Sequence, residues 1–278
     1  MSRRKSWRFI YTGKKDAFFN MALDEALLVS SQKEDNPPVL RLYQWEPKGV
    51  SFGYSQAIEK TLNSKKCQEM KIDFVRRITG GRGVLHDNDL TYSICASAGY
   101  FDSLGESVSE TYKRISLAFL EFLKLLKIRG EFEKNLPREN RVKSFDLSKP
   151  CFSSAIRYEI KVNGRKLMGS AQRRFQNSFI QHGSIPLEDQ SIDLTELLPD
   201  AFSVEKQRLK IKLNKESVCI RSLLGEIPEM DRLISAVKSG FSSFFGVSLV
   251  DDDVSAEELG LAHKLASKYR SEAWNFRR

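Results

Sequence analysis

The chain has 278 residues, of which 41% are hydrophobic and 10% aromatic, and it carries a formal net charge of +9. A chain of this length and apolar content is expected to form one large domain, or one domain with an appendage, and it holds no apolar run near the ~20 residues of a membrane-spanning helix. The charge favours an anionic partner or simply a lysine-rich surface, but the basic residues form no aromatic-interleaved stripe of the kind that binds single-stranded nucleic acid.

The N-terminal region is expected to alternate strands with helices. A helix is predicted over residues 16–31, because apolar side chains recur at helical spacing and Asp16 or Asn20 can cap its start. Within it, Asp24 and Glu25 are interpreted as a solvated face rather than as a catalytic carboxylate pair. Strands are predicted over residues 7–12, 39–45, 50–54, 72–77 and 90–96, with turn chemistry at 46–49 and a second helix over 59–71.

A glycine-rich loop follows the strand predicted over residues 72–77. Gly80, Gly81 and Gly83 let the backbone bend sharply and turn its N–H groups toward a ligand, and the neighbouring arginines add charge for a carboxylate, a phosphate or an acidic carrier. The spacing matches neither the phosphate-binding loop nor the dinucleotide fingerprint. A simple turn would explain the glycines but not the clustered arginines or His86, which favours a binding loop.

The centre of the chain is predicted to contain the longest helix, over residues 107–127, whose aromatic stripe is interpreted as core. Cys95, in the strand before it, is likewise interpreted as a small core residue. Residues 129–149 are charged and contain proline, which predicts an irregular excursion that ends at Cys151.

A hairpin follows this excursion. Residues 158–162 alternate apolar and charged side chains, which is the period of a half-buried strand, and Asn163-Gly164 supplies the two positive-φ residues of a tight turn. The return strand carries Lys166, and Lys161 lies across from it if the turn is two residues long.

Small residues follow Lys166 on the return strand. Gly169, Ser170 and Ala171 would let a ligand or another backbone approach closely. A thiol at Cys151 just upstream and an amine at Lys166, beside a slot this narrow, indicate acyl chemistry.

The C-terminal third is predicted to be mainly helical. Helices are expected over residues 192–198, 228–245 and 256–269, a lysine-rich peripheral segment over 201–213, and a short turn capped by Ser222. Strands dominate the first 185 residues and helices are interspersed irregularly, which predicts an α+β fold with a mixed sheet. Four cysteines without a Cys-x-x-Cys pair, and only three histidines, make a zinc site or a disulfide framework improbable.

Several motifs in this order resemble the lipoate and octanoate ligase and transferase family nearly from end to end. They are Asn20-Met21-Ala22-Leu23-Asp24-Glu25-Ala26-Leu27, Arg76-Arg77-x-Thr79-Gly80-Gly81-Arg82-x-Val84-Leu85-His86, Leu90-Thr91-Tyr92-Ser93, Gly169-Ser170-Ala171-Gln172, Gln181-His182-Gly183-Ser184 and Trp274-Asn275-Phe276. One departure is Gly83, where the family has alanine.

Within that family the chain looks most like the Cys-dependent octanoyltransferases. The resemblance rests on a cysteine before the hairpin and on Thr-Gly-Gly-Arg where the ATP-dependent ligases carry a triple glycine. It implies a catalytic domain of the biotin and lipoate ligase type over residues 1–250, related to the class II synthetase core, with a helical tail over 251–278 packed on it. A cytoplasmic location is the default, because the basic N-terminus lacks the apolar stretch of a secretory signal, and a monomer without a cofactor, and without nucleic acid or membrane partners, is expected. This monomer would move octanoyl from acyl carrier protein to a lysine of the glycine cleavage H protein or another lipoyl domain.

The resemblance also assigns roles to individual residues. Cys151 is implied to hold the acyl group as a thioester, and Lys166 to act as a base or a nearby positive charge. Amides around Gly80, Gly81 and Gly169 are candidates for binding the thioester oxygen, and His86 either orients the loop or lines the acyl slot. The implied substrate-binding residues are Arg77, Thr79, Gly80, Gly81, Arg82, His86, Gly169 and Ser170, and exposed basic groups that attract acidic carrier proteins are expected at Arg76, Arg82 and Arg173.

Three alternatives stay open. The chain is an ATP-dependent lipoate-protein ligase in which Cys151 is incidental, an amidotransferase that moves octanoyl between lipoyl domains, or a non-catalytic basic module that binds a carrier protein or nucleic acid. The presence of both Cys151 and Lys166 argues against the last.

Overall fold

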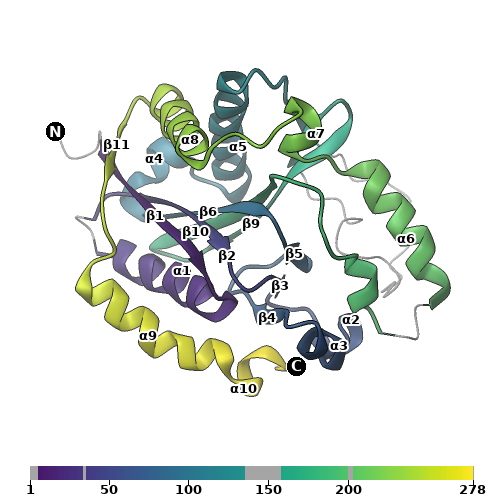
Figure 1. The fold of residues 1–278 in the computed structure, drawn as a ribbon. Coiled ribbons are helices and arrows are strands. Elements are labelled where there is room, and N and C mark those ends of the chain that lie inside the picture. The colour runs from purple at the N-terminus through teal and green to yellow at the C-terminus, as the bar shows by residue number, and fades with distance from the viewer. Residues whose placement is uncertain (1–5, 34–35, 135–157, 200–202, 278) are drawn as a thin grey trace.

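The computed structural model of the chain describes residues 6–33, 36–134, 158–199 and 203–277. They form one eight-stranded and one three-stranded sheet with helices around them, which confirms the predicted α+β class (Figure 1). The large sheet has the order β11 (Ser248–Asp251), β1 (Ser6–Lys15), β2 (Val39–Trp45), β6 (Asp89–Ser97), β10 (Ser178–Pro186), β9 (Arg165–Arg174), β8 (Tyr158–Val162) and β7 (Glu131–Lys134), and the small sheet has the order β4 (Asp73–Arg76), β3 (Gly49–Phe52) and β5 (Val84–His86).

The large sheet is mixed. β1 pairs in parallel with both β2 and β11, whereas the remaining neighbours, from β2 through β6, β10, β9 and β8 to β7, pair antiparallel. Every residue of β6 is buried, because helices cover both faces of the sheet at its centre. β7 and β11 were not foreseen in the sequence: β7 lies in the predicted irregular excursion, and β11 is mostly exposed, so it lacks an apolar pattern.

Helices cover both faces of the large sheet (Figure 1). α1 (Ala17–Ser31) and α9 (Ala256–Arg270) pack in one core, which also contains Cys95, and α5 (Val108–Leu125) and α8 (Met230–Phe245) pack in the other. Phe119 and Phe122 of α5 are buried in this second core, so the aromatic stripe of the long helix is core as predicted. Asp16 caps α1 by accepting a hydrogen bond from the Phe19 amide at 2.7 Å. At Gly240 a β-carbon would lie 2.6 Å from the Phe122 amide nitrogen, so glycine permits α5 and α8 to approach this closely.

The small sheet has its own core, closed by short helical segments. The helix predicted over residues 59–71 is in fact two helices, α2 (Ile58–Thr61) and α3 (Ser64–Glu69), and Asn63 caps the second. The other helical segments are η2 (Ala98–Tyr100), α4 (Phe101–Leu104), η3 (Leu194–Leu197), α6 (Ser203–Glu216), α7 (Ile220–Leu224) and α10 (Glu272–Asn275). Within the described ranges, no helix is both long and apolar enough to cross a membrane.

Arg76 joins the C-terminal segment to the strand that leads into the glycine loop. Its guanidinium donates hydrogen bonds to the carbonyls of Tyr54 and Gln56 on one side and of Asn275 on the other, at 2.6–2.8 Å, and the Asn275 side chain accepts from the Arg76 amide. Only 1% of Arg76 is exposed. The expectation that Arg76 attracts carrier proteins from the surface is therefore wrong, because its guanidinium is buried and donates its hydrogen bonds to backbone carbonyls.

Candidate functional site

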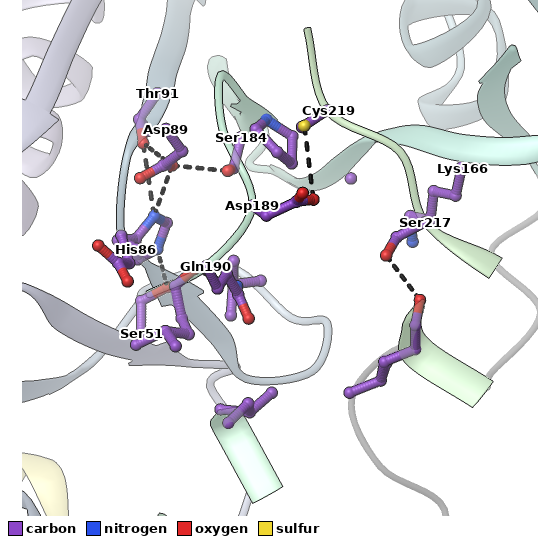
Figure 2. Close-up of a pocket in the computed structure, with 18 of the residues that line it drawn as sticks. Ser51, His86, Asp89, Thr91, Lys166, Ser184, Asp189, Gln190, Ser217 and Cys219 are labelled. Carbon is purple, nitrogen blue, oxygen red and sulfur yellow. Dashed lines mark hydrogen bonds and ion pairs between the residues drawn. The ribbon is translucent and has the colours of Figure 1, made fainter. Parts of the chain in front are cut away.

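A cavity of about 770 Å³ opens where the large sheet, the small sheet and α6 meet. Figure 2 shows Lys166 and the cluster around His86 on different walls of it. α6 was expected to be peripheral, but Lys210 and Leu213 on this helix form part of the cavity wall. The predicted site residues that line the cavity are Arg77, Gly81, Arg82, His86, Lys166, Gly169 and Ser170.

The hairpin presents Lys166 as its sequence predicts. Asn163 and Gly164 have φ angles of 51° and 73°, and Lys161 pairs with Lys166 across the strands. The Lys166 ammonium lies 3.0 Å from a Glu159 carboxylate oxygen, and Lys161, the expected source of a like charge, pairs with the Glu133 carboxylate instead.

Small residues let the lysine lie close to the backbone. A β-carbon at Gly169 would contact Lys166 Cε at 3.5 Å and Nζ at 3.7 Å, so the amine packs over bare backbone. At Gly183, on the neighbouring strand, a β-carbon would lie 2.5 Å from Ser170 Oγ, which leaves room only for glycine. The narrow slot predicted from Gly169 and Ser170 is therefore present beside Lys166.

The thiols separate into two groups. Cys151, the predicted nucleophile, lies outside the described residues. Burial raises the pKa of Cys67 to about 12, and burial first, with the nearby Asp24 charge second, raises that of Cys95 well above its usual range. Both thiols are therefore inert core residues, as expected for Cys95.

Cys219 is a cavity residue that the sequence reasoning missed. The amide of Val218 donates a 3.0 Å hydrogen bond to the Lys166 carbonyl, which places Cys219 next to the lysine strand. The thiol is 2% exposed, and its sulfur lies 3.5 Å from an Asp189 carboxylate oxygen (Figure 2). Nothing in the local sequence predicts this position, because only the parallel bridge between Lys166 and Ser217 creates it.

The glycine loop is fixed by hydrogen bonds to its carbonyl oxygens. Arg77, which is 5% exposed, donates to the carbonyls of Gly80 at 3.1 Å and Arg82 at 2.8 Å, while the carbonyls before Gly80 accept from Arg173 and Tyr54. Within the part of the chain that the structure describes, the amides of Gly80 and Gly81 donate no hydrogen bond. These amides are available to an anion or a polarised carbonyl oxygen.

Asp24 is buried at the inner end of the site and not on a solvated helix face. Its carboxylate accepts hydrogen bonds from Arg41 at 2.7 Å, Tyr43 at 2.9 Å and Ser93 at 2.7 Å, and contacts His182 Nδ1 at 3.2 Å. Burial alone would raise the pKa of Asp24, but the hydrogen bond from His182 and the charge of Arg41 hold it below its ordinary 3.8. The sequence interpretation fails because these partners come from distant strands. Glu25 is also engaged, with Lys268 and Tyr269.

His86 lies in a second buried cluster. Its Nδ1 is 2.9 Å from Asp89 Oδ2 and its Nε2 is 2.7 Å from Ser51 Oγ, and the ring stacks on Trp45 with centroids 3.8 Å apart (Figure 2). Burial alone would raise the pKa of Asp89, but its contact with His86, with hydrogen bonds from Ser184 and Thr91, holds the pKa below 3.8.

The cavity is large enough for an acyl chain and has both polar and apolar walls. It brings the amines of Lys166 and Lys210, the thiol of Cys219 and the backbone of Gly81 to the same space, and its walls include apolar side chains such as Trp45, Leu85 and Leu167. Among the described residues, no group of three or more His, Cys, Asp or Glu side chains is placed to hold a metal ion. Thr79 and Gly80 belong to the loop but do not line the cavity, and the Thr79 hydroxyl contacts the cavity residue His182 through a 2.6 Å hydrogen bond.

Comparison with known proteins identifies similar chains over nearly the full length. Residues 16–242 match the lipoyl protein ligase A/B catalytic domain. The chain is 37% identical to octanoyltransferase LipM of Bacillus subtilis over 281 residues, covering 99% of this chain and 100% of that protein. It is also 37% identical to octanoyltransferase LipM of Staphylococcus aureus over 279 residues, covering 99% of each chain.

Solved structures share the fold at lower identity. A lipoate-protein ligase A bound with ATP superposes with a TM-score of 0.79 at 22% identity, covering 98% of each chain. A bipartite lipoate protein ligase from Thermoplasma acidophilum superposes with the same TM-score at 20% identity, covering 98% of this chain and 96% of the other.

Proposed function

The chain belongs to the lipoyl protein ligase A/B catalytic domain family, and from this premise we propose that it is an octanoyltransferase of protein lipoylation that carries the octanoyl group as a thioester on Cys151. The observation that carries the proposal is the full-length similarity, at 36–39% identity, to relatives named octanoyltransferase. The amine of Lys166 over the bare backbone of Gly169, inside a cavity bordered by the glycine loop, supports it.

The first half-reaction loads the enzyme. Lys166, in its uncharged amine form, accepts the proton of the Cys151 thiol, and the thiolate attacks the carbonyl carbon of an octanoyl thioester. The bond from that carbon to the donor sulfur breaks, and the departing thiolate takes the proton. The amides of Gly80 and Gly81 stabilise the oxyanion of the tetrahedral intermediate, since the carbonyls of the same peptide groups, those of Thr79 and Gly80, accept hydrogen bonds from Tyr54 and Arg77.

The second half-reaction unloads the enzyme. The amine of an acceptor lysine attacks the thioester carbon, Cys151 leaves as a thiolate, and the proton lost by the new amide nitrogen restores the thiol through Lys166. The overall exchange converts a thioester and an amine into a thiol and an amide, so no ATP is consumed. The cavity therefore has to admit two protein partners in turn.

Acyl carrier protein is the proposed donor, and the glycine cleavage H protein or another lipoyl domain is the proposed acceptor. Both are expected to be acidic, which suits a chain of net charge +9. A cationic surface lies beside the glycine loop: the guanidinium carbons of Arg173 and Arg277 are 4.5 and 3.8 Å from the Tyr54 ring centroid. Hydrogen bonds first from Arg277 and then from Arg173 lower the pKa of Tyr54. We define Tyr54, Arg173 and Arg277 as the arginine platform and place partner docking there.

The proposal is tested by incubating the purified protein with octanoyl acyl carrier protein and apo H protein, with and without ATP. Transfer of octanoyl to H protein without ATP is expected. A strict requirement for ATP and magnesium with free lipoate would instead identify a ligase, and transfer only from an octanoylated lipoyl domain would identify an amidotransferase. A lack of any acyl transfer would contradict the proposal altogether.

A further inference from the structure

Two buried histidines flank the glycine loop, and each stands between a carboxylate and a hydroxyl. In the first hydrogen-bonded series, His86 links Asp89 at 2.9 Å to Ser51 at 2.7 Å. In the second, His182 links Asp24 at 3.2 Å to Thr79 at 2.6 Å. Both histidines are 4% exposed. We call these two series of hydrogen bonds the His86 relay and the His182 relay.

The chemistry of the partners fixes the proton on each ring. Asp24 and Asp89 are ionised and only accept hydrogen bonds, so in each histidine Nδ1 carries the proton and donates. In a neutral ring Nε2 is then an acceptor, and the hydroxyl donates to it. Burial lowers the pKa of His182 below its ordinary 6.5 in spite of Asp24, which keeps that ring neutral. A histidine with both nitrogens engaged in this way has no position left for a substrate proton.

Each relay ends on the glycine loop. In the His182 relay the terminal hydroxyl belongs to Thr79, which is itself a loop residue. In the His86 relay Ser51 donates to the ring and accepts from Arg77 Nη1 at 2.7 Å, and Arg77 Nη2 in turn holds the carbonyls of Gly80 and Arg82. The two relays therefore reach the same loop from opposite sheets, His86 from β5 and His182 from β10.

In the loop held in this way, carbonyl oxygens are bonded to the protein and two amides are left available. The carbonyls of Ile78, Thr79, Gly80 and Arg82 all accept hydrogen bonds from the protein, at 2.8–3.1 Å. The amides of Gly80 and Gly81 have no acceptor among the described residues, and both glycines are exposed. An oxyanion site needs donors whose direction is set before charge develops, because reorganisation during the reaction would cost part of the stabilisation.

We propose that His86 and His182 are positioning residues, and that their relays lock the glycine loop so that the amides of Gly80 and Gly81 face the reacting carbonyl. This rests on the proposed acyl transfer and adds the residues that orient its oxyanion site. The histidines do not exchange protons with substrate. Their removal affects the transition state and leaves binding of the acyl chain unchanged.

Kinetics separate this role from proton transfer. His86→Asn keeps a nitrogen near Asp89 but loses the contact to Ser51, and Thr79→Val removes the hydroxyl of the His182 relay at nearly constant shape. Each is expected to lower kcat for acylation by on the order of 10²-fold with KM unchanged. Thr79→Ser, which keeps the hydroxyl, should restore the rate. His263→Asn changes an exposed histidine on α9 and serves as the matched control.

The pH dependence of single-turnover acylation gives a second criterion. Positioning residues leave both limbs of the profile where the wild-type protein has them, only at a lower rate. Disappearance of a limb in His86→Asn or in His182→Gln would overturn the proposal, as would activity equal to that of His263→Asn. If the wild-type protein itself transfers no octanoyl group, the proposed function fails and not the relays alone.

A measurement on the wild-type protein does not depend on any variant folding. Nitrogen-15 NMR of histidine-labelled protein distinguishes the two neutral tautomers. An Nδ1–H proton is expected at neutral pH on both His86 and His182, because each Nδ1 faces an ionised carboxylate. An Nε2–H tautomer at either buried histidine would contradict the direction of the relays.

Discussion

Replacing Gly53 by alanine tests how tightly the glycine loop must be placed. A β-carbon there would lie 1.9 Å from the Gly81 carbonyl oxygen and 2.8 Å from its carbonyl carbon. The neighbours are backbone atoms, so the loop has to retreat by roughly 1 Å before the contact is tolerable, and a misplacement of about that size costs ~10²-fold in rate. Overpacking of this kind costs about 1–3 kcal/mol of stability, which a protein of this size survives.

The assay is single-turnover acylation by octanoyl acyl carrier protein, with thermal unfolding measured on the same samples. Gly53→Ala should be folded, with an unfolding temperature lower by several degrees, and about 10²-fold slower. Gly260→Ala adds the same methyl group where no atom lies within 4 Å and should match the wild type. Equal acylation rates for folded Gly53→Ala and the wild type would refute the argument that this loop positions the reacting groups.

Three other perturbations follow from the same structure. Lys166→Arg should slow single-turnover acylation by ~10²–10⁴-fold, because a guanidinium is no base at neutral pH; an unchanged rate would restrict Lys166 to electrostatics. The pKa of His182 lies below 6.5, so the unfolded chain binds its proton first as pH falls. The free energy of unfolding should therefore decline below about pH 6.5, and chemical denaturation of His182→Gln should lack this component. Arg173→Glu and Arg277→Glu should lower kcat/KM for carrier-bound octanoate far more than for a small neutral octanoyl thioester, and the difference should be larger at low salt. The exposed control Lys124→Glu should show no such difference. Equal effects on both substrates would mean that the carrier protein does not dock at the arginine platform.

Local sequence signals predicted the hairpin well. Asn163-Gly164 has few alternatives to a tight turn, and the two-residue turn fixes the pairing of Lys161 with Lys166. The small residues after Lys166 likewise predicted the slot, because the absence of a β-carbon at Gly169 has a direct steric meaning. The part of the site that depends on neighbours in sequence was therefore predictable.

The positions of the buried charges could not be predicted from the sequence. Asp24 was interpreted as a surface residue on α1, but side chains from β2, β6 and β10 make its burial tolerable: Arg41, Tyr43, Ser93 and His182. Arg76 resembles a surface arginine until the C-terminal carbonyls close over it. Cys219 lies at the cavity because the nearby Ser217 forms a parallel β-bridge with Lys166, which no local sequence pattern predicts. Each of these depends on the topology of the chain, which a one-dimensional pattern does not contain.

Mapping the acylated residue tests the central claim most directly. The protein is incubated with octanoyl acyl carrier protein without ATP, stopped in acid, and examined by intact and peptide mass spectrometry. One octanoyl group is expected on the peptide that contains Cys151, lost in Cys151→Ser and retained in Cys219→Ser. An octanoyl group on Cys219, or a folded Cys151→Ser protein that transfers octanoyl at the wild-type rate, would contradict the account.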